Sequence, residues 1–332
     1  APKDSRNCIE AQCVAALLTA AKLDPAYAPT FTYLGHYYCL VGGNTDRGRK
    51  CYLKAVQLDA LERAAGEAMV KAYITDNQKE VCLQFLNDVI HSNEHAQWPF
   101  AALGRIFLFR EGDEEQNEKN LQRAEDNLQE ALRLIHDDAR TWELLGSCYL
   151  RQRKHWPALK AYLEAVKFAP QSVHALVGVA ESYKRLALID EAVDYYRRAQ
   201  ALVPVGTADK MAAYIAYGFA DALLAQAYIR LTSGWQIGAT DSIVQGYTML
   251  QDASGKDSDN YLTDKASVYK LLGDLATFSY HIGPSCFVPV VEGVEAEGNT
   301  ATSKAGVKDV DAANDQLMAH TAGLSLGVGI GA

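Results

Sequence analysis

Large and small apolar residues recur along the middle of the chain with a period of 34 residues. In the segment 141–170, TWELLGSCYLRQRKHWPALKAYLEAVKFAP, they are spaced three and four apart, which places them on one face of an α-helix. A shift of 34 preserves the size class at each marked position: Trp142, Leu145, Gly146, Tyr149, Ala158, Tyr162, Ala165 and Pro170 become Leu176, Val179, Ala180, Tyr183, Ala192, Tyr196, Ala199 and Pro204. The pattern predicts two consecutive copies of one helical unit.

The small residues predict how the helices pair. A glycine or alanine one step after a large apolar residue lets a second helix approach closely, and the proline ends that helix. The spacing W-x2-L-G-x2-Y, then A-x3-F/Y, then P, is the tetratricopeptide signature. It predicts an all-α fold, a right-handed α-solenoid of antiparallel helix pairs. The expected repeat-packing residues are Gly35, Gly104, Trp142, Gly146, Tyr149, Ala158, Ala180, Tyr183 and Ala192.

The repeat array is expected to span residues 1–282, starting inside a repeat. The clearest copies are predicted at 29–60, 97–137, 139–170 and 173–204, with degenerate hairpins at 61–96 and 208–254. Tyr269, Leu272 and Gly273 open what we expect to be one more first helix. In the second copy, the acidic run REGDEEQNEKN reads as an inserted loop. Residues 283–332 are rich in Gly and Ala and lack the helical pattern, so irregular chain is expected there.

The charge balance limits the class of partner. The net charge of −9 argues against a general nucleic-acid or anionic-membrane surface, because phosphate binding needs clustered Lys and Arg. The basic run 151–155 is the exception, and a solvated turn is favoured there over an RNA contact. No apolar stretch is long enough for a membrane span. We therefore expect weak or no direct nucleic-acid binding and no membrane association.

The seven cysteines are scattered and include no C-x-x-C pair. Cys39, Cys51 and Cys148 occupy helical positions inside repeats, where a free thiol acts as a small apolar residue. Free thiols are typical of a reducing compartment, so the cytoplasm, or also the nucleus, is expected.

Candidate catalytic chemistry is sparse. His91 and His95 lie four residues apart with Asp88 one turn earlier, but they straddle a predicted helix end, and a solvated turn is favoured over a metal site. The acidic cluster 113–115 falls in the expected inserted loop and is read as solvent-facing. Phosphate-binding, nucleophile-elbow and zinc-protease motifs are missing. We expect no enzyme activity, cofactor or metal.

The first helices of a tetratricopeptide array line a groove, and exposed Arg and aromatic residues there are frequent peptide anchors. An ordinary mixed-charge surface is an equally good interpretation. Chaperone-binding clamps need a specific set of Lys, Asn and Arg, and Glu143 and Ser147 stand at the corresponding places, which weakens that alternative. The candidate groove-lining residues are Trp98, Arg105, Arg140, Glu143, Arg151, His174, Glu181, Lys184 and Arg185.

Three blocks carry a resemblance to a known family. They are FTYLGHYYCLVGGNTDRGRKCYLKAVQLD at 31–59, the repeats at 142–196, and YKLLGD at 269–274. In order and spacing they resemble the tetratricopeptide scaffold subunits of the superkiller complex. The resemblance implies a segment of a longer, non-catalytic scaffold. Such a scaffold would hold a DExH-box RNA helicase and WD-repeat propeller proteins, and act with the RNA exosome in cytoplasmic 3′–5′ mRNA decay.

Two other functions stay open. The chain could be an adaptor that captures a peptide motif in its groove, for transport or ubiquitin-ligase assembly. It could also be the substrate-recognition arm of an enzyme. A permanent scaffold predicts large apolar patches on the convex face and edges, whereas an adaptor predicts one charged concave pocket.

Overall fold

A computed structural model describes residues 2–110, 112–203, 210–233 and 241–246. These residues form helices and the turns between them, and none of them is in a β-strand. The predicted all-α fold is confirmed. The predictions for 283–332 and for the first helix at 269–273 lie outside the described residues.

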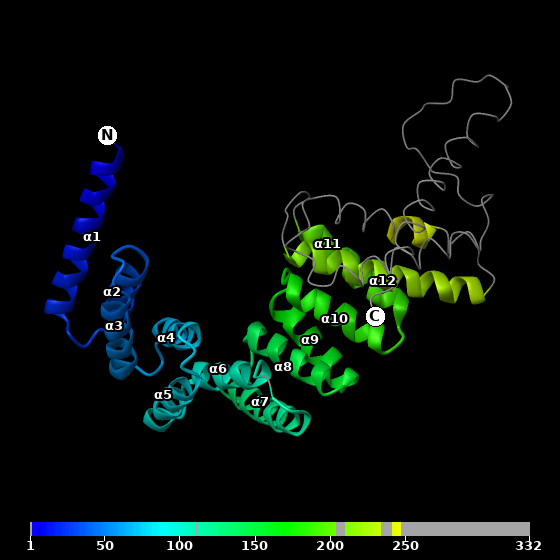
Figure 1. Cartoon of the computed structure of the whole chain (residues 1–332), viewed down its shortest axis with the longest axis horizontal. Coiled ribbons are helices and arrows are strands. Elements are labelled where there is room, and N and C mark those ends of the chain that lie inside the picture. Colours follow the sequence, from blue (N-terminus) through cyan, green and yellow to red (C-terminus); the bar gives the residue numbers. More distant parts are fainter. Residues whose placement is uncertain (1, 111, 204–209, 234–240, 247–332) are drawn as a thin grey trace, which may run out of the picture. The chain divides into compact units, whose positions relative to one another are not determined.

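The chain divides into two compact units, Ala1–Gly178 and Val179–Ala332, which are described separately. Helix α10 (Val173–Arg185) crosses the division. Unit 2 continues with α11 (Ile189–Leu202), α12 (Lys210–Thr232) and helical residues 241–246. Unit 1 contains α1 (Pro2–Leu23), α2 (Ala28–Leu40), α3 (Thr45–Leu58), α4 (Arg63–Thr75), α5 (Lys79–Ser92), α6 (Gln97–Leu108), α7 (Glu114–Leu134), α8 (Ala139–Arg151) and α9 (His155–Phe168) (Figure 1).

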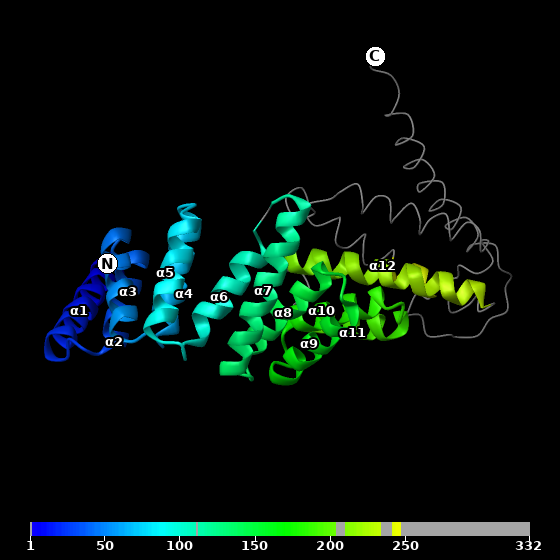
Figure 2. The ribbon, with the colours of Figure 1, turned by 90° about the horizontal axis from the view of Figure 1, so that it is seen from below.

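The helices of unit 1 form hairpins. Helix α2 packs on α3, α4 on α5, α6 on α7 and α8 on α9 (Figure 2). Turns of a few residues join each pair, and such short turns force the two helices to run antiparallel. The even-numbered helices α2, α4, α6 and α8 are the first helices of their pairs, and neighbouring first helices also touch. This is the tetratricopeptide arrangement that the 34-residue period predicts.

A tyrosine on the second helix of a pair packs against a glycine on the first helix. A Cβ atom added to Gly146 would lie 2.8 Å from the Tyr162 ring, and one added to Gly178 would also collide with that ring. Tyr162 is 5% exposed, and its hydroxyl is 2.8 Å from the Ser147 hydroxyl. The ring therefore fixes how closely α9 approaches α8.

The same contact recurs elsewhere in the chain. In the first hairpin, the Tyr52 ring lies against Gly35 and its hydroxyl is 2.9 Å from His36 Nδ1. In unit 2, the Tyr196 hydroxyl donates to Glu181 Oε2 at 3.0 Å, and Gly218 lies beside the ring. In each case the hydroxyl binds the residue that follows the small position of the first helix.

The remaining expected packing residues occupy several environments. Ala158, Ala180 and Ala192 are fully buried. Gly104 faces Leu128, which replaces the tyrosine in that repeat. Trp142 is half-buried and donates to the His136 carbonyl at 2.7 Å, Tyr149 accepts from Gln129 at 3.2 Å, and Tyr183 lies 5.6 Å from the Tyr195 ring.

The acidic insertion is helical rather than a loop, which corrects the prediction for Asp113, Glu114 and Glu115. Asp113 stands at the N-cap position of α7 without a side-chain hydrogen bond to the helix, and both glutamates lie in the first turn. Negative charge is favourable at a helix N-terminus, because it faces the unpaired N–H groups and the positive end of the helix dipole. The three side chains are nevertheless exposed, as the sequence suggested.

The turn inside several hairpins requires a left-handed residue. Asn77, Arg153 and Ala187 have φ angles of 58°, 60° and 60°, and Gly43 has the same conformation. Arginine and alanine are strained there, because their Cβ atoms crowd the backbone.

Replacing Arg153 with glycine should therefore stabilise unit 1 by about 1 kcal/mol, because glycine has no Cβ strain at positive φ. Lys160→Gly is the matched control, since Lys160 is also exposed but lies in the middle of α9. That change should destabilise by about 1 kcal/mol. Urea unfolding measures both, and a shift of the same sign in the two variants would contradict the interpretation.

Substituting Gly178 with valine should destabilise unit 1 by about 1–3 kcal/mol, because the new side chain overlaps the Tyr162 ring. The double variant Gly178→Val/Tyr162→Leu should recover part of the loss. Gly112→Val is the control, since a Cβ there meets only the flexible side chains of Gln116 and Asn117. Thermal unfolding followed by circular dichroism compares the variants. Equal melting temperatures for Gly178→Val and wild type would show that the Tyr162 ring does not limit the space at Gly178.

Candidate protein-binding surface

One predicted surface residue lies in the core. Trp98 is only 3% exposed, its ring packs on Gly66 of the preceding first helix, and its indole N–H donates to the Ala60 carbonyl at 2.8 Å. This corrects the expectation that Trp98 lines a surface. The physical reason is that Gly66 leaves room for a large ring where first helices touch.

Other predicted residues of unit 1 are accessible. Arg140 and His174 are exposed, and Arg105 is half-buried. None of the three forms an ion pair with a carboxylate in the described part of the chain. Their polar ends therefore stay available to a partner.

The predicted residues Glu143 and Arg151 of α8 bind neighbouring elements. Arg151 donates to the Leu108 carbonyl and lies over the Phe109 ring at 5.6 Å. Glu143 accepts from the Ser172 hydroxyl. Further along the basic run, Lys154 pairs with Glu125 at 3.0 Å. These contacts support the interpretation of 151–155 as a turn rather than an RNA contact.

The predicted residues of unit 2 form one ion network. Glu181 accepts from Lys184 and Arg185, each at 2.9 Å, and Lys184 also pairs with Asp221 at 2.9 Å. Burial raises the pKa of Glu181, but the Lys184 charge and the hydrogen bonds from Lys184, Arg185 and Tyr196 outweigh it, so the pKa lies below its usual value. The network links the first helices α10 and α12 within unit 2.

A polar cluster in unit 1 was not predicted. The carboxylate of Asp138 accepts from Gln97 at 2.9 Å and from Thr141 at 2.7 Å, and lies 3.3 Å from the Arg63 guanidinium. These groups come from α4, from α6 and from the start of α8. Because α6 lies between α4 and α8 in the chain, the Asp138 cluster joins three consecutive first helices. The only sequence signal for this cluster was an aspartate at a helix N-cap position. Its partners are distant in the sequence and leave no local pattern.

Burial raises the pKa of Asp138, but its hydrogen bonds and the Arg63 charge more than offset this, so the pKa is lowered. The ionised carboxylate thus stabilises the folded state at neutral pH.

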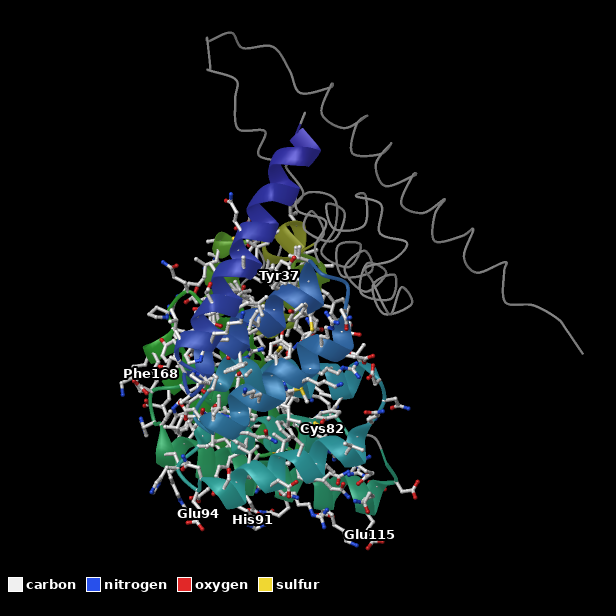
Figure 3. The ribbon with its side chains drawn as sticks, turned by 90° about the vertical axis from the view of Figure 1, so that its left-hand side faces the viewer. Tyr37, Cys82, His91, Glu94, Glu115 and Phe168 are labelled. Atoms are coloured by element: carbon white, nitrogen blue, oxygen red, sulfur yellow. The ribbon has the colours of Figure 1, made fainter. Side chains whose placement is uncertain are left out.

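The described ranges show neither a cluster of metal ligands nor a reactive cysteine thiol. No group of three potential metal ligands occurs there. His91 and Glu94 lie at the lower edge of the view in Figure 3, whereas the Cys82 side chain is fully buried. Burial raises the pKa of the Cys82 thiol to about 11 and that of Cys148 to about 12, which makes both poor nucleophiles. No helix within the described ranges is both long and apolar enough to cross a membrane.

Unit 2 has a polar pocket of about 400 Å³ between α11, α12 and residues 241–246. Its polar groups bind one another: Gln226 donates to Asp190 at 2.6 Å and accepts from Ser242 at 2.9 Å. These two hydrogen bonds join α11, α12 and residues 241–246.

Replacing Asp138 with asparagine should destabilise unit 1 by about 1–3 kcal/mol at pH 7, because the Arg63 and Gln97 groups lose a charged partner. Since the folded pKa is lowered, this stabilisation is present above the unfolded pKa of about 3.9 and is lost as the pH falls through the folded value. The difference from wild type should therefore shrink toward acidic pH.

Urea unfolding between pH 7 and pH 3 measures this difference. Asp88→Asn is the control, because Asp88 is exposed on α5. A constant offset between Asp138→Asn and wild type at every pH would contradict the linkage.

Comparison with known proteins finds relatives named tetratricopeptide repeat protein 37 and superkiller complex protein 3. Tetratricopeptide repeat protein 37 of Xenopus laevis is 31% identical over 273 residues, which are 82% of this chain and 16% of that protein. Human superkiller complex protein 3 is 29% identical over 271 residues, which are 81% of this chain and 16% of that protein. The chain thus spans 16% of the length of these relatives. No protein-family model matches it.

A solved structure supports the fold. The crystal structure of the APC/C hetero-tetramer Cut9–Hcn1 aligns with a TM-score of 0.54 at 15% identity, over 80% of this chain and 46% of that one. At this identity the likeness bears on the fold alone.

Proposed function

The chain is a tetratricopeptide-repeat protein homologous to a segment of superkiller complex protein 3, and from this premise we propose that it is part of a non-catalytic scaffold. The scaffold holds an RNA helicase and WD-repeat propeller subunits. Through them it acts with the RNA exosome in cytoplasmic 3′–5′ mRNA decay.

The observation that carries the proposal is homology over about four fifths of the chain, at 82% and 81% coverage. An alignment of 273 residues extends into both units. The structure contributes hairpins packed as a stack, which offers partners an extended surface rather than an enclosed active site.

Large apolar side chains on second helices support a scaffold with permanent partners. Trp156 on α9 is 59% exposed, and Val81 on α5 is 45% exposed. Such residues on the second helices fit interfaces that bury apolar area.

The test is affinity purification of the chain in its full-length context. It should recover a DExH-box helicase and a WD-repeat protein. The assembly should persist at about 0.3 M salt, because salt at that ionic strength screens exposed ion pairs within a few ångströms but leaves apolar interfaces intact. The purified chain should hydrolyse neither ATP nor RNA. It should also bind single-stranded RNA only weakly.

Deletion of residues 141–204, which hold most of helix α8 and helices α9 to α11, is the negative control, because neighbouring hairpins then lose the surface on which they pack. Recovery of chaperones or ubiquitin-ligase subunits instead of the helicase would reject the superkiller assignment and leave the fold unchanged.

A further inference from the structure

The second helix α3 carries three basic side chains along its exposed face. Arg47, Lys50 and Lys54 are all exposed. They are three and four residues apart, so they lie in one stripe along the helix. The other side of α3 packs on α2 and α4 and holds the four buried residues of the helix, which are Gly48, Tyr52, Ala55 and Val56. The basic side chains therefore point away from the core of the hairpin.

The same face becomes apolar toward the C-terminal end of α3. Leu58 lies four residues after Lys54 and is 40% exposed. Leu53, three residues after Lys50, is 36% exposed, and Leu61, in the turn that follows the helix, is 55% exposed. We call these six residues the α3 stripe: Arg47, Lys50, Leu53, Lys54, Leu58 and Leu61.

The positive charges of the α3 stripe are not neutralised by neighbouring side chains. In the residues that the structure describes, none of its three basic groups forms an ion pair with a carboxylate. Lys54 Nζ lies 4.2 Å from the centre of the Phe31 ring, a contact that orients the ammonium group and keeps its charge. The helix has one acidic residue, Asp46. Its exposed side is thus positive, although the chain carries a net charge of −9.

The repeat does not need these charges in order to fold. In the repeat register, Gly48 and Tyr52 of α3 correspond to Ala158 and Tyr162 of α9, and to Ala192 and Tyr196 of α11. At the three basic positions α9 carries Pro157, Lys160 and Glu164, and α11 carries Glu191, Asp194 and Arg198. The same hairpin thus forms with a mixed or acidic set there. The basic set on α3 is free to serve a partner.

We propose that the α3 stripe binds an acidic amphipathic helix of a partner protein. A helix laid along α3 repeats the spacing of three and four residues, so its carboxylates meet the basic half of the stripe and its leucine-like side chains meet the apolar half. The basic half also lies at the N-terminus of α3, where the helix dipole favours negative charge.

The length of the stripe suits a short helix. From Arg47 to Leu58 it extends about 16 Å along the axis of α3, at about 1.5 Å per residue, which about three turns of a partner helix would cover. This inference rests on the proposed scaffold function, and it assigns a second-helix surface to one of the partners.

Single-stranded RNA fits the α3 stripe less well than an acidic helix does. Proteins that bind a single strand stack its bases on exposed aromatic side chains between basic ones. The one aromatic residue of α3, Tyr52, is buried against Gly35. The exposed apolar side chains of the stripe are all leucines, which pack on aliphatic groups and do not stack on bases.

The test measures binding of the full chain to a fluorescent, alanine-rich helical peptide of about 18 residues. One half of the peptide carries glutamates and the other half leucines, each three and four residues apart. Fluorescence anisotropy at about 0.15 M salt should show saturable binding that weakens as the salt concentration rises. Replacing the glutamates with lysine, or the leucines with serine, should also weaken binding.

Lys50→Glu should reduce the affinity for the glutamate peptide about tenfold, which corresponds to about 1.4 kcal/mol. The matched control is Lys160→Glu, which changes an exposed lysine at the same register of α9 and should bind like wild type. The double variant Arg47→Glu/Lys50→Glu should lose the glutamate peptide and bind the lysine peptide instead. Circular dichroism checks that each variant folds.

No binding of the glutamate peptide to wild type, or equal weakening by Lys50→Glu and Lys160→Glu, would overturn the proposal. An oligouridylate of about nine nucleotides is the competing probe. If it binds more tightly than the peptide and responds to the same variants, the α3 stripe is a nucleic-acid surface and the proposal is wrong.

Affinity purification of the wild-type protein separates this inference from the proposed function. Absence of the helicase and the propeller from the purified assembly rejects the scaffold. An intact assembly, together with no binding of the glutamate peptide, rejects only the role of the α3 stripe.

Discussion

Every hairpin contact described above depends on how closely a second helix can approach a first helix. At Tyr162 this distance is fixed by a ring pressed between two glycines, and the ring keeps its hydroxyl on Ser147. The interaction has an apolar part that sets the helix separation and a polar part that orients the next side chain. Glu181 and His36 are oriented in the same way by their own tyrosines. Packing therefore determines which first-helix side chains remain free.

The fold could be predicted from the sequence because the contact that sets the helix pairing, a small residue against a tyrosine, lies within one repeat. Gly146 and Tyr162 lie 16 residues apart within one repeat, and their size pattern returns after 34 residues. The repeat register can therefore be checked within one sequence, by comparing one repeat with the next. The antiparallel pairing follows from the short turns, which include the left-handed residue at Arg153.

The surface was harder to predict, because it depends on contacts between repeats. Trp98 reads as a surface aromatic until Gly66, 32 residues earlier, is placed against it. The Asp138 cluster depends on partners 41 and 75 residues away. The acidic run of α7 was misread because its composition resembles a loop, whereas its charges suit a helix N-terminus.

The Asp138 cluster also bears on how unit 1 responds to mechanical force. A solenoid with contacts only between adjacent repeats should release them one at a time when pulled from its ends. The Arg63–Asp138 contact reaches past the intervening hairpin, and Gln97 of that hairpin binds the same carboxylate, so the hairpins of α4, α6 and α8 are joined at Asp138. Under tension these three hairpins should yield together, as a stiff block between more extensible neighbours.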